Sequence, residues 1–342
     1  MRSCEPCLER ACKLLPASAR PTSGLPTQID VQLARERHER AELPAICRHC
    51  EGYPSALLEL EDPPWVLWLR GDPTLLRSLE HEPSVAMVGA RRASPYGLGM
   101  ATELGRGLGV AGVPVVSGLA LGIDAAAHRG ALEGGGPAIA VLACGADIAY
   151  PRRHRGLYEQ LSACGLVVSE LPPGEPVRRW AFPQRNRIMA ALASMTLLVE
   201  GAIASGSMIT ADHALNLGRE VGAVPGRVTA RVAGGSHHLI RAGAILIRHI
   251  DDLLDALYGV GLGPAGPRAA RERNAAASER LARSLREVLD GAEAGHGIDA
   301  ICSRSGLEAR QVRAALAELE LRGHLVRTAL GGYERAARAP AP

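Results

Sequence analysis

Residues 113–132 read VPVVSGLALGIDAAAHRGAL, and this stretch decides the fold. It opens with a short run of branched apolar residues, continues through a loop with Ser and Gly, and passes into a segment in which Ala127, Ala131 and Leu132 recur at helical spacing. Short apolar runs bounded by turn signals are typical of buried strands, and the spacing that follows is typical of a helix. The stretch therefore predicts one strand–loop–helix unit.

The same alternation recurs along the chain. Further strand candidates are residues 66–68, 85–88, 138–142, 166–168, 196–199 and 222–224. Helical spacing returns between them, as in Met100, Leu104 and Leu108. Strands that alternate with helices build βαβ units, so we predict an α/β fold with a doubly wound, mostly parallel sheet.

Composition limits the class of protein. The chain has 342 residues, of which 47% are hydrophobic, so it can bury one sizeable core and carry a smaller second domain. No run approaches the roughly 18 uncharged apolar residues of a membrane span, and the first residues lack the apolar stretch of a secretory signal. We therefore expect a cytoplasmic protein with no membrane partner. The formal net charge of +3 does not by itself point to nucleic acid.

Two pairs of cysteines have the spacing of zinc knuckles. They are Cys4 with Cys7 and Cys47 with Cys50. Two such pairs can supply a tetrahedral thiolate site, so we expect one structural zinc ion on these four residues. The segment between the pairs, about 39 residues, is longer than in most zinc ribbons. Thiols without a metal ion, and His38 or His49 as a replacement ligand, are the alternatives.

Changes in composition divide the chain into four parts. We expect a Cys-bearing N-terminal module at 1–52, the sheet domain at 53–260, a Gly- and Pro-rich linker at 261–279 and an independent domain at 280–335. The last part shows three amphipathic helical stretches followed by two short strand candidates at 323–327 and 332–335. Three helices followed by a hairpin are typical of a winged helix.

The loops that follow the predicted strands are rich in glycine, serine and arginine. They hold Gly89, Arg91 and Arg92 after one strand, Ser117 and Gly118 after the next, and Ser205, Gly206, Ser207 and Thr210 after a later one. In a doubly wound sheet these loops share the edge formed by the carboxyl ends of the strands, where ligands bind. Glycine lets the backbone approach a phosphate, and the following helix directs N–H donors at it. We therefore predict an anion site; the alternative is that the glycines only permit close packing.

Residues 182–189, FPQRNRIM, add an aromatic ring and two arginines at the start of a predicted helix. Phe182 is the only phenylalanine in the chain, and Arg185 and Arg187 flank Asn186. Proteins hold single strands without reading their sequence by stacking bases on an aromatic face, with arginines on the flanking phosphates. The alternative is that Phe182 is a core residue and that the arginines are solvated.

Two common nucleotide chemistries find little support. The chain has no G-x-x-x-x-G-K-[ST] motif, and Lys13 is its only lysine, which argues against a Walker-type ATPase. One strand leads into Gly89-Ala90-Arg91 instead of G-x-G-x-x-G, so no nucleotide cofactor is expected. The i,i+4 spacing of Asp124 and His128 suggests acid–base chemistry or a metal site, but we favour a polar pair that fixes the start of a helix.

The same loops carry a resemblance to a known family. The motifs are, in order, 88–91 (VGAR), 117–124 (SGLALGID) with His128, Gly145 with 150–151 (YP), 169–170 (SE), 182–188 (FPQRNRI), Glu200, 205–211 (SGSMITA), 225–226 (PG), and 235–240 (GSHHLI) with Gly243 and Ala244. Together they resemble the DNA-processing protein A (DprA, also called Smf) family over about residues 53–257. So many separated motifs in one order make coincidence remote.

The resemblance implies an extended Rossmann fold, often with a C-terminal winged helix, and a homodimer. It also implies a protein that binds and protects single-stranded DNA and loads the RecA recombinase on it during natural transformation. We expect a binding protein and no catalytic residues. The predicted DNA-binding residues are Gly89, Arg91, Arg92, Ser117, Gly118, Phe182, Arg185, Asn186, Arg187, Ser205, Gly206, Ser207 and Thr210. Ala90, Gly201 and Ala204 depart from the residues usual in the family, which weakens any expectation about affinity.

Two other functions are compatible with parts of the sequence. One is a nucleotide hydrolase that resembles phosphoribohydrolases, with Glu200 or Glu170 acting on a phosphorylated nucleoside. The chain lacks the P-G-G-x-G-T-x-x-E string of those enzymes. The other is a winged-helix transcription regulator acting through residues 280–335, where acidic residues offset most of the arginines.

Overall fold

The computed structural model describes residues 41–263 without a gap. It also describes Cys7, Glu36, Glu39, Arg40, residues 298–305, Val312, Leu316, and residues 325–327 and 333–335. The chain divides into two compact units, Met1–Ala265 and Gly266–Pro342. Each unit is described by itself below.

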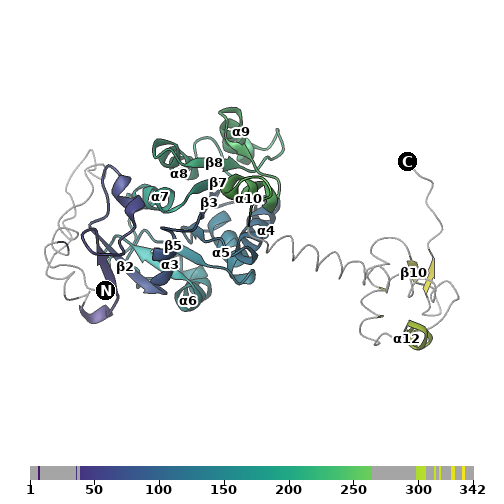
Figure 1. Cartoon of the computed structure of the whole chain (residues 1–342). Coiled ribbons are helices and arrows are strands. Elements are labelled where there is room, and N and C mark those ends of the chain that lie inside the picture. Colours follow the sequence, from purple (N-terminus) through teal and green to yellow (C-terminus); the bar gives the residue numbers. More distant parts are fainter. Residues whose placement is uncertain are drawn as a thin grey trace. The chain divides into compact units, whose positions relative to one another are not determined.

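A nine-stranded sheet forms the centre of the first unit (Figure 1). Its strands are β1 (Ala45–Cys47), β2 (Val66–Gly71), β3 (Val85–Gly89), β4 (Val115–Ser117), β5 (Ala138–Val141), β6 (Leu166–Ser169), β7 (Met195–Glu200), β8 (Glu220–Ala223) and β9 (Ile245–Leu246). Their order is β1-β2-β6-β5-β4-β3-β7-β8-β9. In this spatial order, every neighbouring pair from β6 through to β9 is parallel. β2 runs antiparallel to β6, and β1 runs antiparallel to β2. The predicted doubly wound, mostly parallel sheet is confirmed.

Helices cover both faces of the sheet, as Figure 1 shows. They are α3 (Thr74–Ser78), α4 (Pro95–Val110), α5 (Ile123–Glu133), α6 (Arg155–Cys164), α7 (Ala181–Leu192), α8 (Gly206–Asn216), α9 (Gly234–Arg241) and α10 (Ile250–Tyr258), with short 3-10 helices η2 (Ser55–Glu59), η3 (Arg152–His154) and η4 (Arg231–Ala233). One core cluster joins α4, α5, α6 and α10 to the sheet, and a second joins α7, α8, α9 and η2 to it. Alternate side chains of each strand supply the two clusters, as expected for a sheet buried on both faces.

Two glycines allow α4 and α5 to pack closely. A Cβ atom at Gly105 would lie 2.5 Å from the carbonyl oxygen of Ala127, and one at Gly130 would overlap the carbonyl oxygen of Thr102. Any larger residue at either position forces the helices apart. This contact fixes α5 beside α4, and therefore fixes the loop from Ser117 to Gly122 that leads into α5.

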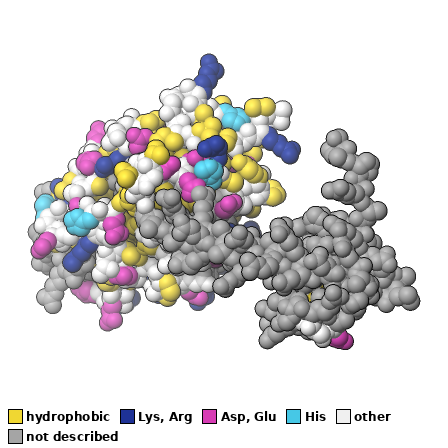
Figure 2. Space-filling view, turned by 45° about the vertical axis from the view of Figure 1, so that its right-hand side comes forward, with side chains coloured by type: hydrophobic (Ala, Val, Ile, Leu, Met, Phe, Trp, Pro, Cys, Tyr) yellow, Lys and Arg dark blue, Asp and Glu magenta, His cyan; other side chains and the backbone are white. Residues whose placement is uncertain are grey.

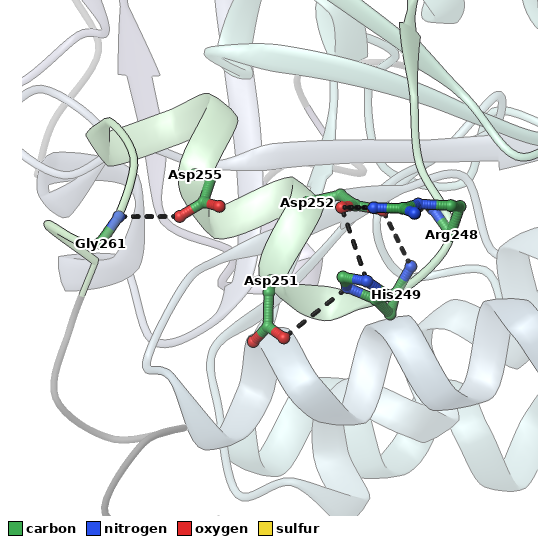
Figure 3. Close-up of polar contacts among 6 residues, drawn as sticks. All are labelled: Arg248, His249, Asp251, Asp252, Asp255 and Gly261. Atoms are coloured by element: carbon green, nitrogen blue, oxygen red, sulfur yellow. Dashed lines mark hydrogen bonds and ion pairs between the residues drawn. The ribbon is translucent and has the colours of Figure 1, made fainter.

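The last described helix of the first unit is α10. Its N-terminus has a capping box. The His249 side chain accepts the backbone N–H of Asp252, and the Asp252 side chain accepts the backbone N–H of His249. Arg248 donates to Asp252 from its backbone N–H at 2.7 Å, and its guanidinium pairs with the same carboxylate at 3.0 Å (Figure 3). At the other end of the helix, Asp255 accepts the backbone N–H of Gly261 at 3.0 Å. These contacts hold the apolar face of α10, with Leu253 and Leu254, against the core.

The described part of the second unit contains α12 (Ile298–Ser305), β10 (Leu325–Arg327) and β11 (Tyr333–Arg335). The two strands pair antiparallel with Val326 opposite Glu334, as predicted for the hairpin. The first and third predicted helical stretches lie outside the described residues, apart from the buried Val312 and Leu316.

The structure also corrects details of the sequence prediction. Two short strands, β1 and β9, were not predicted, and β4 begins at Val115, after Pro114. β1 lies inside the predicted N-terminal module 1–52, yet it pairs with β2 and belongs to the main sheet. Across the described part of the chain, no helix is both long and apolar enough to cross a membrane.

Candidate nucleic-acid interface

A cavity of about 410 Å³ opens at the carboxyl edge of the sheet. The chain leaves β3 towards β4 on one side and returns to β7 on the other, so the topology switches direction beside β3. A crevice at such a switch point is the usual ligand site of doubly wound sheets. Of the predicted DNA-binding residues, those that line it are Gly89, Arg91, Phe182, Arg185, Asn186, Ser205, Gly206, Ser207 and Thr210. The structure therefore brings together loops that are more than 100 positions apart in the sequence.

Arg91 and Phe182 lie together on the cavity wall. The guanidinium carbon of Arg91 lies 4.4 Å from the centre of the Phe182 ring, a cation–π distance. Arg91 is exposed and Phe182 is half-buried, with the ring packed against the small cluster of Ala143, Leu171 and Ala181. The ring of Tyr150 lies 6.2 Å away at 49°. Phe182 is therefore not a residue of the two main core clusters.

The N-terminus of α8 forms the opposite wall. Ser205 precedes the helix in extended conformation, and among the described residues no side chain caps it. Open space surrounds the position where Gly206 would carry a Cβ atom, and the amide of Asn186 donates to the Gly206 carbonyl at 3.0 Å. Thr210 is buried, and its hydroxyl has no hydrogen-bond partner in the described part of the chain. A helix start with accessible backbone N–H groups favours an anionic ligand.

Arg185 lines the cavity but is buried. Only 5% of the residue is exposed, and its Nη1 donates to the carbonyl oxygen of Val141 at 2.8 Å. Its Nη2 lies 4.0 Å from the carboxylate of Asp124. The guanidinium occupies the space where a Cβ atom of residue 118 would lie, so only glycine fits at that position. Burial raises the pKa of Asp124, and the charge of Arg185 opposes that shift; burial likewise lowers the pKa of Arg185.

Arg187 points away from the cavity. Its Nη2 donates to the carboxylate of Glu170 at 2.7 Å, and the side chains of this pair are 8% and 14% exposed. The alternative that both arginines are solvated is wrong, because both are buried. Two positions along a helix correspond to a rotation of about 200°. Arg187 therefore lies on the other side of α7 from Arg185, beside Glu170 at the end of β6.

The remaining predicted residues lie beside the cavity. Ser117 is fully buried and donates its hydroxyl to the carbonyl oxygen of Met87 at 2.6 Å, which joins β4 to β3. Gly118 lines a smaller neighbouring cavity of about 60 Å³ together with Arg91, Phe182 and Arg185. Arg92 is exposed and does not line either cavity.

Asp124 and His128 do not form the polar pair that their spacing predicted. Asp124 accepts the backbone N–H of Ala120 at 3.4 Å and faces Arg185. His128 is fully buried, and no hydrogen bond joins its ring to the Asp124 carboxylate. Burial lowers the pKa of His128 to about 3, so the ring is neutral. The prediction failed because a helix turn brings the two residues to one face without aiming their polar atoms at each other.

The two carboxylates required by a hydrolase are engaged elsewhere. Both oxygens of Glu200 accept from Ser94, one from its backbone N–H and one from its hydroxyl, each at 2.7 Å. Ser94 in turn caps α4 by accepting the N–H of Gly97. Glu170 is held by Arg187. Neither carboxylate is placed as a base in the cavity.

Sequence reasoning missed the apolar lining of the cavity. Met189, Ile209 and Val232 contribute to it. Ile209 follows Gly206 by three positions on α8, and this helical spacing is the one signal in the sequence that links it to the site.

The predicted metal ligands lie near β1, at one edge of the sheet. Cys7, Cys47 and Cys50 are described, with His49 beside them, whereas Cys4 lies outside the described residues.

Comparison with known proteins identifies the family. Residues 45–258 match the model of DNA recombination-mediator protein A, and residues 269–329 match that of the DprA winged helix domain, which confirms the predicted winged helix. The chain is 42% identical over 264 residues to a DNA processing protein DprA of Mycobacterium tuberculosis, covering 76% of this chain and 66% of that protein. It is 37% identical over 297 residues to protein Smf of Escherichia coli, covering 84% of this chain and 76% of that protein.

Two solved structures have the same fold as the first unit. DNA processing protein A from Streptococcus pneumoniae gives a TM-score of 0.61 at 37% identity, over 67% of this chain and 78% of that one. DNA processing protein A from Helicobacter pylori, described for its single-stranded DNA binding mode, gives 0.57 at 29% identity, over 63% of this chain and 95% of that one. The chain therefore belongs to the DNA recombination-mediator protein A (DprA) family.

Proposed function

We propose that this protein binds single-stranded DNA in the cavity at the carboxyl edge of the sheet. The observation that carries the proposal is the exposed guanidinium of Arg91 over the half-buried ring of Phe182, beside the uncapped N-terminus of α8. These features supply a cation, an aromatic face and backbone N–H donors within one cavity. Single strands offer the matching groups, because their bases are unstacked and their phosphates are accessible.

The surface supports a local site. Charged side chains of both signs are interspersed with apolar ones on the face of the first unit that Figure 2 shows. The formal net charge of the chain is only +3. Affinity therefore depends on a small number of placed contacts, and Arg91 is the exposed arginine of the cavity.

Family membership extends the proposal to the protein's role. We infer that the protein is a recombination mediator of the cytoplasm that protects incoming strands and loads the RecA recombinase on them during natural transformation, acting as a homodimer. The H. pylori relative, described for its single-stranded DNA binding mode, supports the DNA-binding part. The engagement of Glu200 and Glu170 in structural contacts supports a binding protein without enzymatic activity.

Replacing Arg91 with alanine tests the site. Arg91 is exposed, so the fold should be unaffected, while single-strand affinity should fall and the slope of log affinity against log salt should drop by about 0.7 for one lost phosphate contact. Arg106→Ala is the matched control, because Arg106 is an exposed arginine of α4 that does not line the cavity. Unchanged affinity and slope in Arg91→Ala, or an equal loss in Arg106→Ala, would overturn the proposed site.

A further inference from the structure

Three donor groups from two distant parts of the chain, Cys7, Cys47 and His49, meet beside β1, and Cys50 lies next to Cys47. The Sγ atom of Cys7 lies 3.0 Å from Nδ1 of His49, although the two residues are 42 positions apart. The Sγ atoms of Cys47 and Cys50 lie 2.9 Å apart. The ligand atoms of Cys7, Cys47 and His49 all lie within 4.8 Å of one another. Cys7 and Cys47 are buried, with 2% and 0% of their surfaces exposed.

The sulfurs of Cys47 and Cys50 lie close together without a covalent link. A disulfide bond is about 2.05 Å long, so the sulfurs of Cys47 and Cys50 are not bonded. Zn–S bonds are about 2.3 Å long, so two sulfurs on one tetrahedral zinc ion lie about 3.8 Å apart, about 0.9 Å further apart than the sulfurs of Cys47 and Cys50 are here. Buried thiolates need a cation to offset the cost of removing their charge from water.

The backbone around Cys47 has the tight turn that a zinc knuckle requires. Cys47 ends β1, and the N–H of Cys50 donates to the Cys47 carbonyl at 2.9 Å. The turn is fixed to β2 by the N–H of Arg48, which donates to the carbonyl of Trp65 at 3.1 Å, and by the Arg48 guanidinium, 3.1 Å from the centre of the Trp65 ring. The thiols of Cys47 and Cys50 are therefore presented on one side of a preformed loop.

We propose that Cys7, Cys47 and Cys50 bind one structural zinc ion, with Cys4 as the fourth ligand. The assignment of Cys4 rests on the Cys4-x2-Cys7 spacing, which repeats that of the second pair. In this proposal His49 is an outer-shell partner: its Nδ1, 3.0 Å from the Cys7 sulfur, carries the proton that the thiolate accepts. The ion fastens the N-terminal segment to β1, the three-residue edge strand of the sheet. This site is separate from the DNA-binding cavity.

Metal analysis of the full chain, purified without chelators, tests the proposal. We expect about one zinc per chain in the unmodified protein and less than about 0.1 in Cys47→Ser, whereas Cys164→Ser, an exposed thiol at the end of α6, should keep its zinc. Cys4→Ser should also lose the ion, and His49→Ala should retain it. Cobalt exchanged into the unmodified protein should give the thiolate charge-transfer bands of a tetrahedral site, a readout that needs no variant.

The outcomes separate the possible errors. Less than about half a zinc per chain in the unmodified protein, without cobalt charge-transfer bands, would overturn the site itself. Retention of zinc in Cys4→Ser together with its loss in His49→Ala would overturn the assigned fourth ligand. Zinc retained in Cys47→Ser would place the ion elsewhere. Single-strand binding is not among these readouts, so failure here leaves the proposed DNA site untouched.

Discussion

Replacing Arg187 with alanine should destabilise the fold and leave the DNA site intact. The substitution removes the guanidinium that lies 2.7 Å from the Glu170 carboxylate and leaves that carboxylate buried without its partner. Breaking a buried ion pair in this way typically costs about 3–5 kcal/mol of the free energy of unfolding. Because 14% of the Glu170 side chain is exposed, water compensates in part, and we expect a cost of about 3 kcal/mol.

Urea unfolding of a double-mutant cycle measures this cost. Arg187→Ala and Glu170→Ala should each lower the free energy of unfolding of the first unit, and the double variant should lose less than the two single losses together, by about 0.5–3 kcal/mol. Arg155→Ala is the matched control, since Arg155 pairs with Glu159 at 2.9 Å on the surface, with both side chains more than half exposed. That surface pair should change stability by less than about 1 kcal/mol.

Single-strand binding by the folded variant completes the test. If Arg187 serves the fold alone, the salt slope of Arg187→Ala matches that of the unmodified protein. A stability loss below about 1 kcal/mol, combined with a salt slope reduced by about 0.7, would instead show that Arg187 contacts phosphate and would refute the reasoning from its burial.

Two further predictions concern His128 and Phe182. Burial lowers the pKa of His128 to about 3, so the unfolded chain binds a proton that the folded protein does not; stability is lost as pH falls from about 6.5 towards 3, by up to about 1.4 kcal/mol per pH unit. Urea unfolding between these pH values should show a flatter dependence in His128→Leu, and an identical slope would contradict the burial of a neutral ring. Phe182→Ala should weaken single-strand binding by about 1–3 kcal/mol without changing the salt slope, which titrations at several salt concentrations can measure; a changed slope with unchanged affinity would contradict base stacking.

The strands could be predicted from sequence where they are buried on both faces, because such strands are continuous runs of apolar residues. β3, β5, β6 and β7 are such runs. β1 and β9 have only three and two residues, and they exist because a neighbouring strand offers a free edge, which no local pattern reports.

The site was predictable in its location but not in the roles of its charges. The loops at one edge follow from the topology alone. The roles of Arg185 and Arg187 depend on their acidic partners, Asp124 and Glu170, which are distant in sequence and adjacent only in the fold. Arg91 and Phe182 are likewise distant in sequence and adjacent only in the fold. The exposure of Arg91 distinguishes it from Arg185 and Arg187, and this difference is visible only in the folded structure.

Photo-cross-linking of a single-stranded oligonucleotide to the full chain, with the attached residues located by mass spectrometry, tests most directly where DNA binds. Binding in the cavity predicts cross-links at Phe182 on its wall and at Tyr150, which lines the smaller neighbouring cavity and whose ring lies 6.2 Å from that of Phe182. These cross-links should be lost when unlabelled single strand competes. Cross-links confined to the second unit, with none around the cavity, would contradict binding at the carboxyl edge of the sheet.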